Sequence, residues 1–129
     1  MEKIFLSAAE TVIMKAIWDS KGKKLSICDL ISLLKEDYGK EYARTSVMTF
    51  LEKLSYKGFV RCKREGKYSY VESLRDEEEY VAEVINNQID YWYDGSVAQA
   101  ISALMERKKV SREDLEQILA ILGNAVETK

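Results

Sequence analysis

The stretch from Tyr42 to Tyr70 constrains the fold more than any other part of the chain, because a helical pattern there ends at a glycine and continues into a basic hairpin. Starting at Val47, apolar residues recur at i, i+3, i+4 and i+7, the spacing of one stripe along a helix. The opposite face carries Thr45, Met48, Thr49, Glu52 and Tyr56. The pattern therefore predicts a helix over 44–57 that packs through its apolar stripe and presents a polar face to a partner.

A two-stranded hairpin is predicted directly after this helix, which stops at Gly58. Residues 59–63 and 68–72 have strand character, and residues 64–67 form a turn in which Gly66 supplies a positive φ. Ahead of the helix, Ser7 with Glu10 is a capping box that opens a first helix, and Ser26 caps a second one that ends at about residue 39. Leu25 adds one or two residues of strand between them.

Three helices followed by a hairpin are typical of a winged helix-turn-helix, in which the second and third helices form the helix-turn-helix and residues 59–72 form the wing. The predicted fold class is mainly α with a small β wing. We assign residues 1–73 to a winged-helix DNA-binding domain and residues 74–129 to a helical dimerisation domain.

The region 74–129 is predicted to contain three short amphipathic helices. One begins with an acidic first turn at 76–79, one spans 96–107 and one runs from Ser111 to near Gly123. Such helices bury little surface alone, which favours an oligomerisation unit completed by a second chain over a self-sufficient bundle. The residues predicted to form the dimer core are Val84, Ile85, Ile89, Trp92, Ile101, Leu104, Leu115, Ile118, Leu119 and Leu122.

The charges are distributed unequally along the chain. Residues 1–73 hold 14 Lys and Arg against 10 Asp and Glu, a net charge of +4. Residues 74–129 hold 6 against 12, a net charge of −6. The positive charges of the first part cluster on the predicted third helix and hairpin, where they would favour an anionic partner such as nucleic acid.

Composition argues against an enzyme or a metal protein. The chain has no histidine, and its two cysteines, Cys28 and Cys62, fit no zinc spacing, so no catalytic residue, metal site or cofactor is expected. Cys28 is interpreted as a small buried side chain rather than a reactive thiol. The two basic residues beside Cys62 favour a lowered pKa of its thiol, but a redox-sensing role is not expected. The carboxylates of Glu10, Asp29, Glu36 and Asp37 are interpreted as solvated.

No stretch approaches the roughly 18 uninterrupted apolar residues of a membrane span, and residues 1–7 lack the features of a signal peptide. A cytoplasmic protein without membrane insertion is therefore expected.

Four segments together resemble a known family. They are LSAAETVIMKAIW at 6–18, TSVMTFLEKLSYKGFV at 45–60, KREGKYSY at 63–70 and YWYDGS at 91–96. In this order and spacing the chain resembles the penicillinase-repressor type regulators, the BlaI, MecI and CopY family.

The resemblance implies a homodimeric repressor that binds double-stranded operator DNA. The polar face of helix 44–57 would then read base edges, while basic groups around it and on the wing would contact phosphates. The residues expected to contact DNA are Ser26, Arg44, Thr45, Ser46, Met48, Thr49, Lys53, Lys57, Arg61, Lys63, Arg64 and Lys67.

The chain departs from the family pattern at three places. Met48 stands where an arginine is usual, so a bidentate contact to guanine is replaced by a thioether that can touch a thymine methyl. The resemblance also implies a membrane sensor or protease pathway that cleaves an Asn-Phe bond, but Ala103-Leu104 occupies the corresponding position. The cysteine cluster of the copper-responsive branch is absent, because no cysteine follows Cys62.

The alternative function is a winged-helix protein-interaction module that does not bind DNA, which the acidic pI of about 5.4 favours. The clustering of acidic residues in the predicted dimerisation part argues for DNA binding instead.

Overall fold

The computed structural model describes residues 5–107 and 110–127 of the chain. It divides into two compact units, one reaching to Val84 and the other starting at Ile85, and each is considered by itself. The assignment of residues 1–73 to DNA binding and 74–129 to dimerisation concerns function and stays a prediction.

Three helices form most of the first unit: α1 (Ala8–Asp19), α2 (Ile27–Tyr38) and α3 (Arg44–Tyr56). The predicted capping box is confirmed at α1, where the Ser7 hydroxyl accepts from the backbone of Glu10 and the Glu10 carboxylate accepts from the backbone of Ser7. Ser26 caps α2 through the Asp29 N–H, and Gly39 ends that helix with a φ of 64°. All three predicted helices therefore exist, and the predicted starts of α1 and α2 and the end of α2 follow local capping rules.

The chain turns sharply where α3 ends. Gly58 has a φ of 84°, and the Phe59 N–H donates to the Leu54 carbonyl at 2.9 Å, a Schellman-type end. This geometry sends Phe59 into the core and starts the next strand. The glycine in the predicted helix-to-hairpin junction thus fixes how the wing leaves α3.

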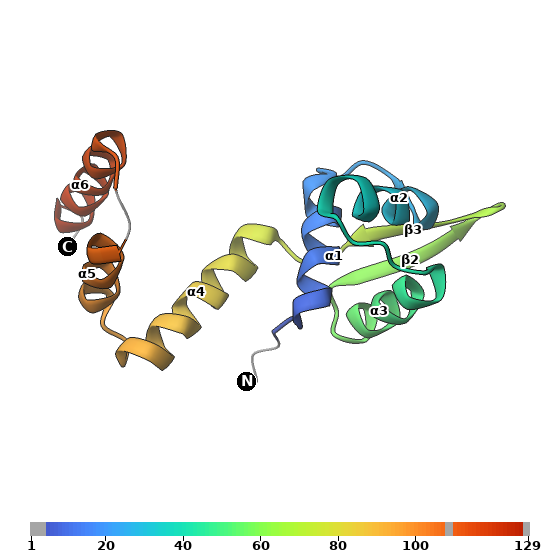
Figure 1. The fold of residues 1–129 in the computed structure, drawn as a ribbon, viewed down its shortest axis with the longest axis horizontal. Helices are drawn as coiled ribbons and strands as arrows, with labels where there is room; N and C mark the ends of the chain where they lie inside the picture. The colour runs from blue at the N-terminus through green and yellow to red at the C-terminus, as the bar shows by residue number, and fades with distance from the viewer. Residues whose placement is uncertain (1–4, 108–109, 128–129) are drawn as a thin grey trace. The chain divides into compact units, whose positions relative to one another are not determined.

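The strands β1 (Leu25–Ser26), β2 (Val60–Glu65) and β3 (Tyr68–Ser73) form an antiparallel sheet in the order β1-β3-β2. The predicted hairpin is confirmed, but its strands are longer than expected and pair up to Glu65 and Tyr68, so the loop contains only Gly66 and Lys67. Figure 1 shows the hairpin extending beyond the three helices. The first unit is therefore a winged helix-turn-helix with a third short strand on the wing.

One hydrophobic core holds the helices to the sheet. Its fully buried side chains include Ile13, Leu30, Leu51 and Phe59. The ring of Tyr80 meets the ring of Phe59 edge to face, with 5.2 Å between centroids. Burial of each such large side chain contributes about 1.5–3 kcal/mol, which makes this core the main source of stability for the unit.

Three more helices complete the chain: α4 (Glu77–Tyr93), α5 (Val97–Arg107) and α6 (Arg112–Glu127). Ser96 and Ser111 accept hydrogen bonds from the backbone N–H groups three residues later, so the two predicted helix starts are confirmed. The predicted end of α6 near Gly123 is wrong, because the helix continues to Glu127. A glycine inside a helix costs only about 1 kcal/mol relative to alanine, so it need not end one.

Candidate nucleic-acid interface

Helix α3 presents its predicted polar face to solvent. The apolar stripe of Val47, Leu51 and Leu54 is fully buried, which holds the back of the helix against the core. The exposed predicted DNA contacts on α3 are Arg44, Thr45, Ser46, Met48, Thr49 and Lys53. The structure therefore brings these side chains together along one accessible strip of helix.

Two hydrogen bonds limit what this strip can offer. The Thr49 hydroxyl donates to the Thr45 carbonyl at 2.9 Å, so the side chain presents its methyl group and its acceptor lone pairs. The Arg44 guanidinium donates to the Cys28 sulfur at 3.5 Å, which holds it at the start of α3 beside α2. In this conformation Arg44 remains the main cationic donor at the N-terminal end of the strip.

Ser26 and Cys28 both lie at the start of α2, and only Ser26 is buried. Ser26 is buried, and its hydroxyl serves as the cap of α2, so that side chain is occupied within the protein. The prediction that Cys28 is buried is wrong, because Cys28 is exposed. The cause is helical phase: Ile27 and Leu30 lie on the core side of α2, whereas Cys28 lies about 100° around the helix from Ile27 and faces outward.

The predicted wing cations do not share one face of the hairpin. Arg61 and Lys63 alternate with Cys62 and Arg64 along β2, so the two pairs point to opposite sides of the sheet. Lys67 lies in the two-residue loop. The wing thus carries positive charge on both faces and at its tip.

The second cysteine, Cys62, is exposed and lies on the same face of the hairpin as Val71. Cys62 pairs across the sheet with the buried Val71, and desolvation raises the pKa of its thiol. The expected lowering of this pKa is therefore wrong. Its basic sequence neighbours point to the other face of the strand.

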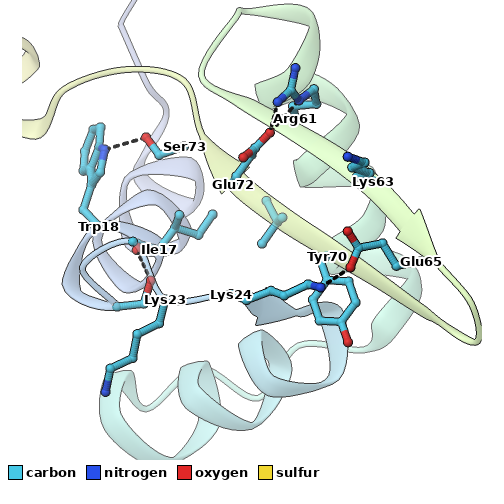
Figure 2. Close-up of a pocket in the computed structure, with 13 residues that line it drawn as sticks. Ile17, Trp18, Lys23, Lys24, Arg61, Lys63, Glu65, Tyr70, Glu72 and Ser73 are labelled. Atoms are coloured by element: carbon cyan, nitrogen blue, oxygen red, sulfur yellow. Dashed lines mark hydrogen bonds and ion pairs between the residues drawn. The ribbon is translucent and has the colours of Figure 1, made fainter.

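A groove of about 540 Å³ lies on the outer face of the wing, between the hairpin and the loop that follows α1. Figure 2 shows Lys24 over the ring of Tyr70 with its ammonium directed to Glu65, and Arg61 directed to Glu72. Lys23 and Lys63 add two more cations to the lining. Lys23 and Lys24 are not among the residues predicted to contact DNA. The three lysines of the segment DSKGKK, residues 19–24, were the available indication of a basic surface.

Lys57 occupies a different environment from the other predicted DNA contacts. Its ammonium lies 2.6 Å from Oε1 of Glu10, whose residue is only 2% exposed. The interpretation of Glu10 as a solvated carboxylate is wrong, because α1 turns this residue toward the end of α3. Burial alone would raise the pKa of Glu10, but hydrogen bonds from Lys57 and Ser7 outweigh it and lower the pKa. Removing Lys57 would leave the Glu10 charge buried and unpaired, a change that typically costs about 3–5 kcal/mol in free energy of unfolding.

The predicted dimer residues fall into two groups. Val84 packs against the core of the first unit. In the second unit, most of the others are exposed within a single chain: Ile85, Trp92, Leu104, Leu115, Leu119 and Leu122. Ile89, Ile101 and Ile118 are half-buried.

The described residues hold no group of three or more potential metal-ligating side chains. Within the same part of the chain, no helix is long and apolar enough to cross a membrane.

Residues 6–124 match the family described as penicillinase repressor. The methicillin resistance regulatory protein MecI of Staphylococcus aureus strain N315 is 25% identical over 118 residues, which is 92% of this chain and 93% of that protein. MecI of Mammaliicoccus sciuri is 24% identical over the same shares. The solution structure of the DNA binding domain of the repressor BlaI is 28% identical, with a TM-score of 0.50, and covers 62% of this chain and 94% of that one.

Proposed function

The chain belongs to the penicillinase repressor family, and from this premise we propose that it is a homodimeric transcriptional repressor that occupies a palindromic operator. The observation that carries the proposal is the exposed polar strip of α3, held from behind by a fully buried apolar stripe. A helix anchored in this way can enter a major groove without losing its packing.

Base reading is assigned to the N-terminal half of α3. Arg44, Thr45, Ser46, Met48 and Thr49 are exposed there and offer a guanidinium, hydroxyl groups, a thioether and methyl groups. Met48 fits a thymine methyl and donates no hydrogen bond, whereas Glu52 can accept from a cytosine amino group. We expect the operator to differ from those of relatives with arginine at the position of Met48.

Phosphate contacts are assigned to Lys53 and to the wing cations Arg61, Lys63, Arg64 and Lys67. Lys53 lies toward the C-terminal end of the exposed strip of α3, and the other four residues belong to the hairpin that projects from the helices (Figure 1). Such contacts set affinity and position without reading sequence.

Dimerisation is assigned to the second unit, because it leaves large apolar side chains exposed in a single chain. An isolated monomer with such a surface would be prone to association, and a symmetric pair buries it twice. The two winged-helix domains of the dimer then match two half-sites of the operator, spaced by one or more turns of the DNA helix, each roughly 34 Å long. Losing the dimer would forfeit avidity on the order of 10²-fold or more.

Relief of repression is proposed to run through a membrane sensor or protease pathway. The bond between Ala103 and Leu104 lies inside α5, so cleavage there requires that helix to unwind locally. Incubation with the protease of the pathway, followed by mass analysis of the fragments, identifies the bond that is cut.

The experiment that tests the proposal is a mobility-shift titration against the promoter of the chain's own gene and against a random duplex of equal length, over a range of salt concentrations. We expect tighter binding to the promoter and a logarithm of affinity that falls steeply with salt. No preference together with a flat salt response would favour the protein-interaction module instead.

A further inference from the structure

The buried pair between Glu10 and Lys57 joins two elements that are distant in the sequence. Glu10 lies in the first turn of α1, and Lys57 is the C-cap residue of α3. Oε1 of Glu10 accepts from the Ser7 N–H at 2.8 Å and from the Lys57 ammonium at 2.6 Å. One carboxylate oxygen therefore caps α1 and holds the end of α3 at the same time.

The ammonium of Lys57 is committed to this carboxylate. Among the described residues, Lys57 is the one cation that forms an ion pair with Glu10. Oε2 of Glu10 is buried without a hydrogen-bond partner in the same part of the chain. If Lys57 turned outward to a phosphate, Glu10 would keep a buried charge with no compensation. The position of Lys57 at the C-terminal end of α3 adds a favourable interaction with the helix dipole.

A second set of contacts braces the same end of α3. The Leu6 N–H donates to the Tyr80 hydroxyl oxygen at 2.8 Å, one residue before the Ser7 N–H that contacts Glu10. The ring of Tyr80 also packs edge to face on Phe59, two residues after Lys57. The last turn of α3 is thus held from α1 by charge and from α4 by an aromatic contact.

We propose that Glu10 and Lys57 are positioning residues for operator binding: the pair fixes the C-terminal end of α3 against α1, and Lys57 acts through Glu10 rather than by contacting DNA. The proposal rests on the proposed function of α3 as the recognition helix. It reassigns Lys57, which the sequence alone places among the phosphate contacts. A recognition helix held at one end keeps its angle to the groove, on which base contacts depend.

Three variants of the full chain test the pair by stability: Lys57→Met, Glu10→Gln and the double variant. Lys57→Met leaves a buried unpaired carboxylate, whereas Glu10→Gln leaves an ammonium that can reach solvent, since the Lys57 side chain is 29% exposed. We therefore expect Lys57→Met to be the more destabilising single change. Glu10→Gln should then rescue it, raising the folding equilibrium constant of Lys57→Met roughly tenfold or more in urea unfolding. Independent, additive losses would overturn the pair as a unit.

Measurements of DNA binding distinguish a positioning role of Lys57 from a direct contact of Lys57 with DNA. The probes are the promoter duplex of the chain's own gene and a random duplex, with Lys53→Met as the matched control on the same helix. Lys53→Met should lower the salt slope by about 1 on both duplexes. Lys57→Met should keep the wild-type slope and random-duplex affinity but lose preference for the promoter, and Lys57→Arg should restore part of that preference.

A salt slope that falls in Lys57→Met as much as in Lys53→Met would overturn the positioning role. If Lys57→Met does not fold, Glu10→Gln carries the same test, because it loosens the helix end without removing any cation. Unchanged promoter preference in a folded Glu10→Gln would then count against the proposal. If the wild-type chain itself shows no promoter preference, the proposed function fails, while the stability cycle still decides whether the pair exists.

Discussion

Shortening Leu119 to alanine tests the proposed dimer surface directly. Leu119 lies in α6 and is 67% exposed in a single chain. Full burial of a leucine side chain contributes about 1.5–3 kcal/mol, so a partner that covers this exposed part adds about 1 kcal/mol or more per copy. A symmetric dimer contains the contact twice, and the total of about 2 kcal/mol corresponds to a roughly 30-fold weaker dimer in the variant.

The assay is sedimentation equilibrium of the full chain over a range of concentrations. Tyr68→Ala is the control, because Tyr68 is 55% exposed but belongs to the first unit and lies outside the assigned dimerisation segment 74–129. We expect Leu119→Ala to raise the Kd of the dimer and Tyr68→Ala to leave it unchanged. Equal dimer constants for all three proteins, or a wild-type chain that stays monomeric at high concentration, would refute the assignment of α6 to the dimer surface.

Three further predictions concern charge, DNA contact and the core. Lys57 helps to lower the pKa of Glu10 below its ordinary value of 4.5, so this pair stabilises the fold above about pH 4.5. The contribution is lost as pH falls further. Urea unfolding should show this loss of stability in the wild type and a smaller loss in Glu10→Gln. Reversing the charges of Arg64 and Lys67 should weaken binding to all duplexes and flatten the salt response, whereas Thr49→Ala should change sequence preference. Equal effects of both changes on every duplex would mean that the phosphate-contacting and base-reading roles are misassigned. Tyr80→Phe should cost about 1 kcal/mol in free energy of unfolding, since it removes the partner of the Leu6 N–H, and the exposed Tyr56→Phe should cost nothing measurable.

Local rules in the sequence determined where several helices of the first unit begin and end. Ser7, Ser26 and Gly39 mark helix ends through hydrogen bonds and backbone angles that involve only nearby residues. The i, i+3, i+4, i+7 stripe of α3 likewise identified its buried side, because helical phase relates residues on one element. These features sufficed to predict the winged helix and the exposed strip of α3.

Only the tertiary structure decided which charged and polar side chains are free to meet a partner. The sequence placed Lys57 with the DNA contacts and Glu10 in solvent. In the structure these two residues, 47 positions apart, form an ion pair at 2.6 Å. The two faces of the wing and the lysines beside its groove also depend on strand register and on how the loop after α1 meets the hairpin. Periodicity describes one element at a time, whereas burial and charge pairing arise between elements. The winged-helix fold could therefore be predicted from the sequence, but the partners of its charged side chains could not.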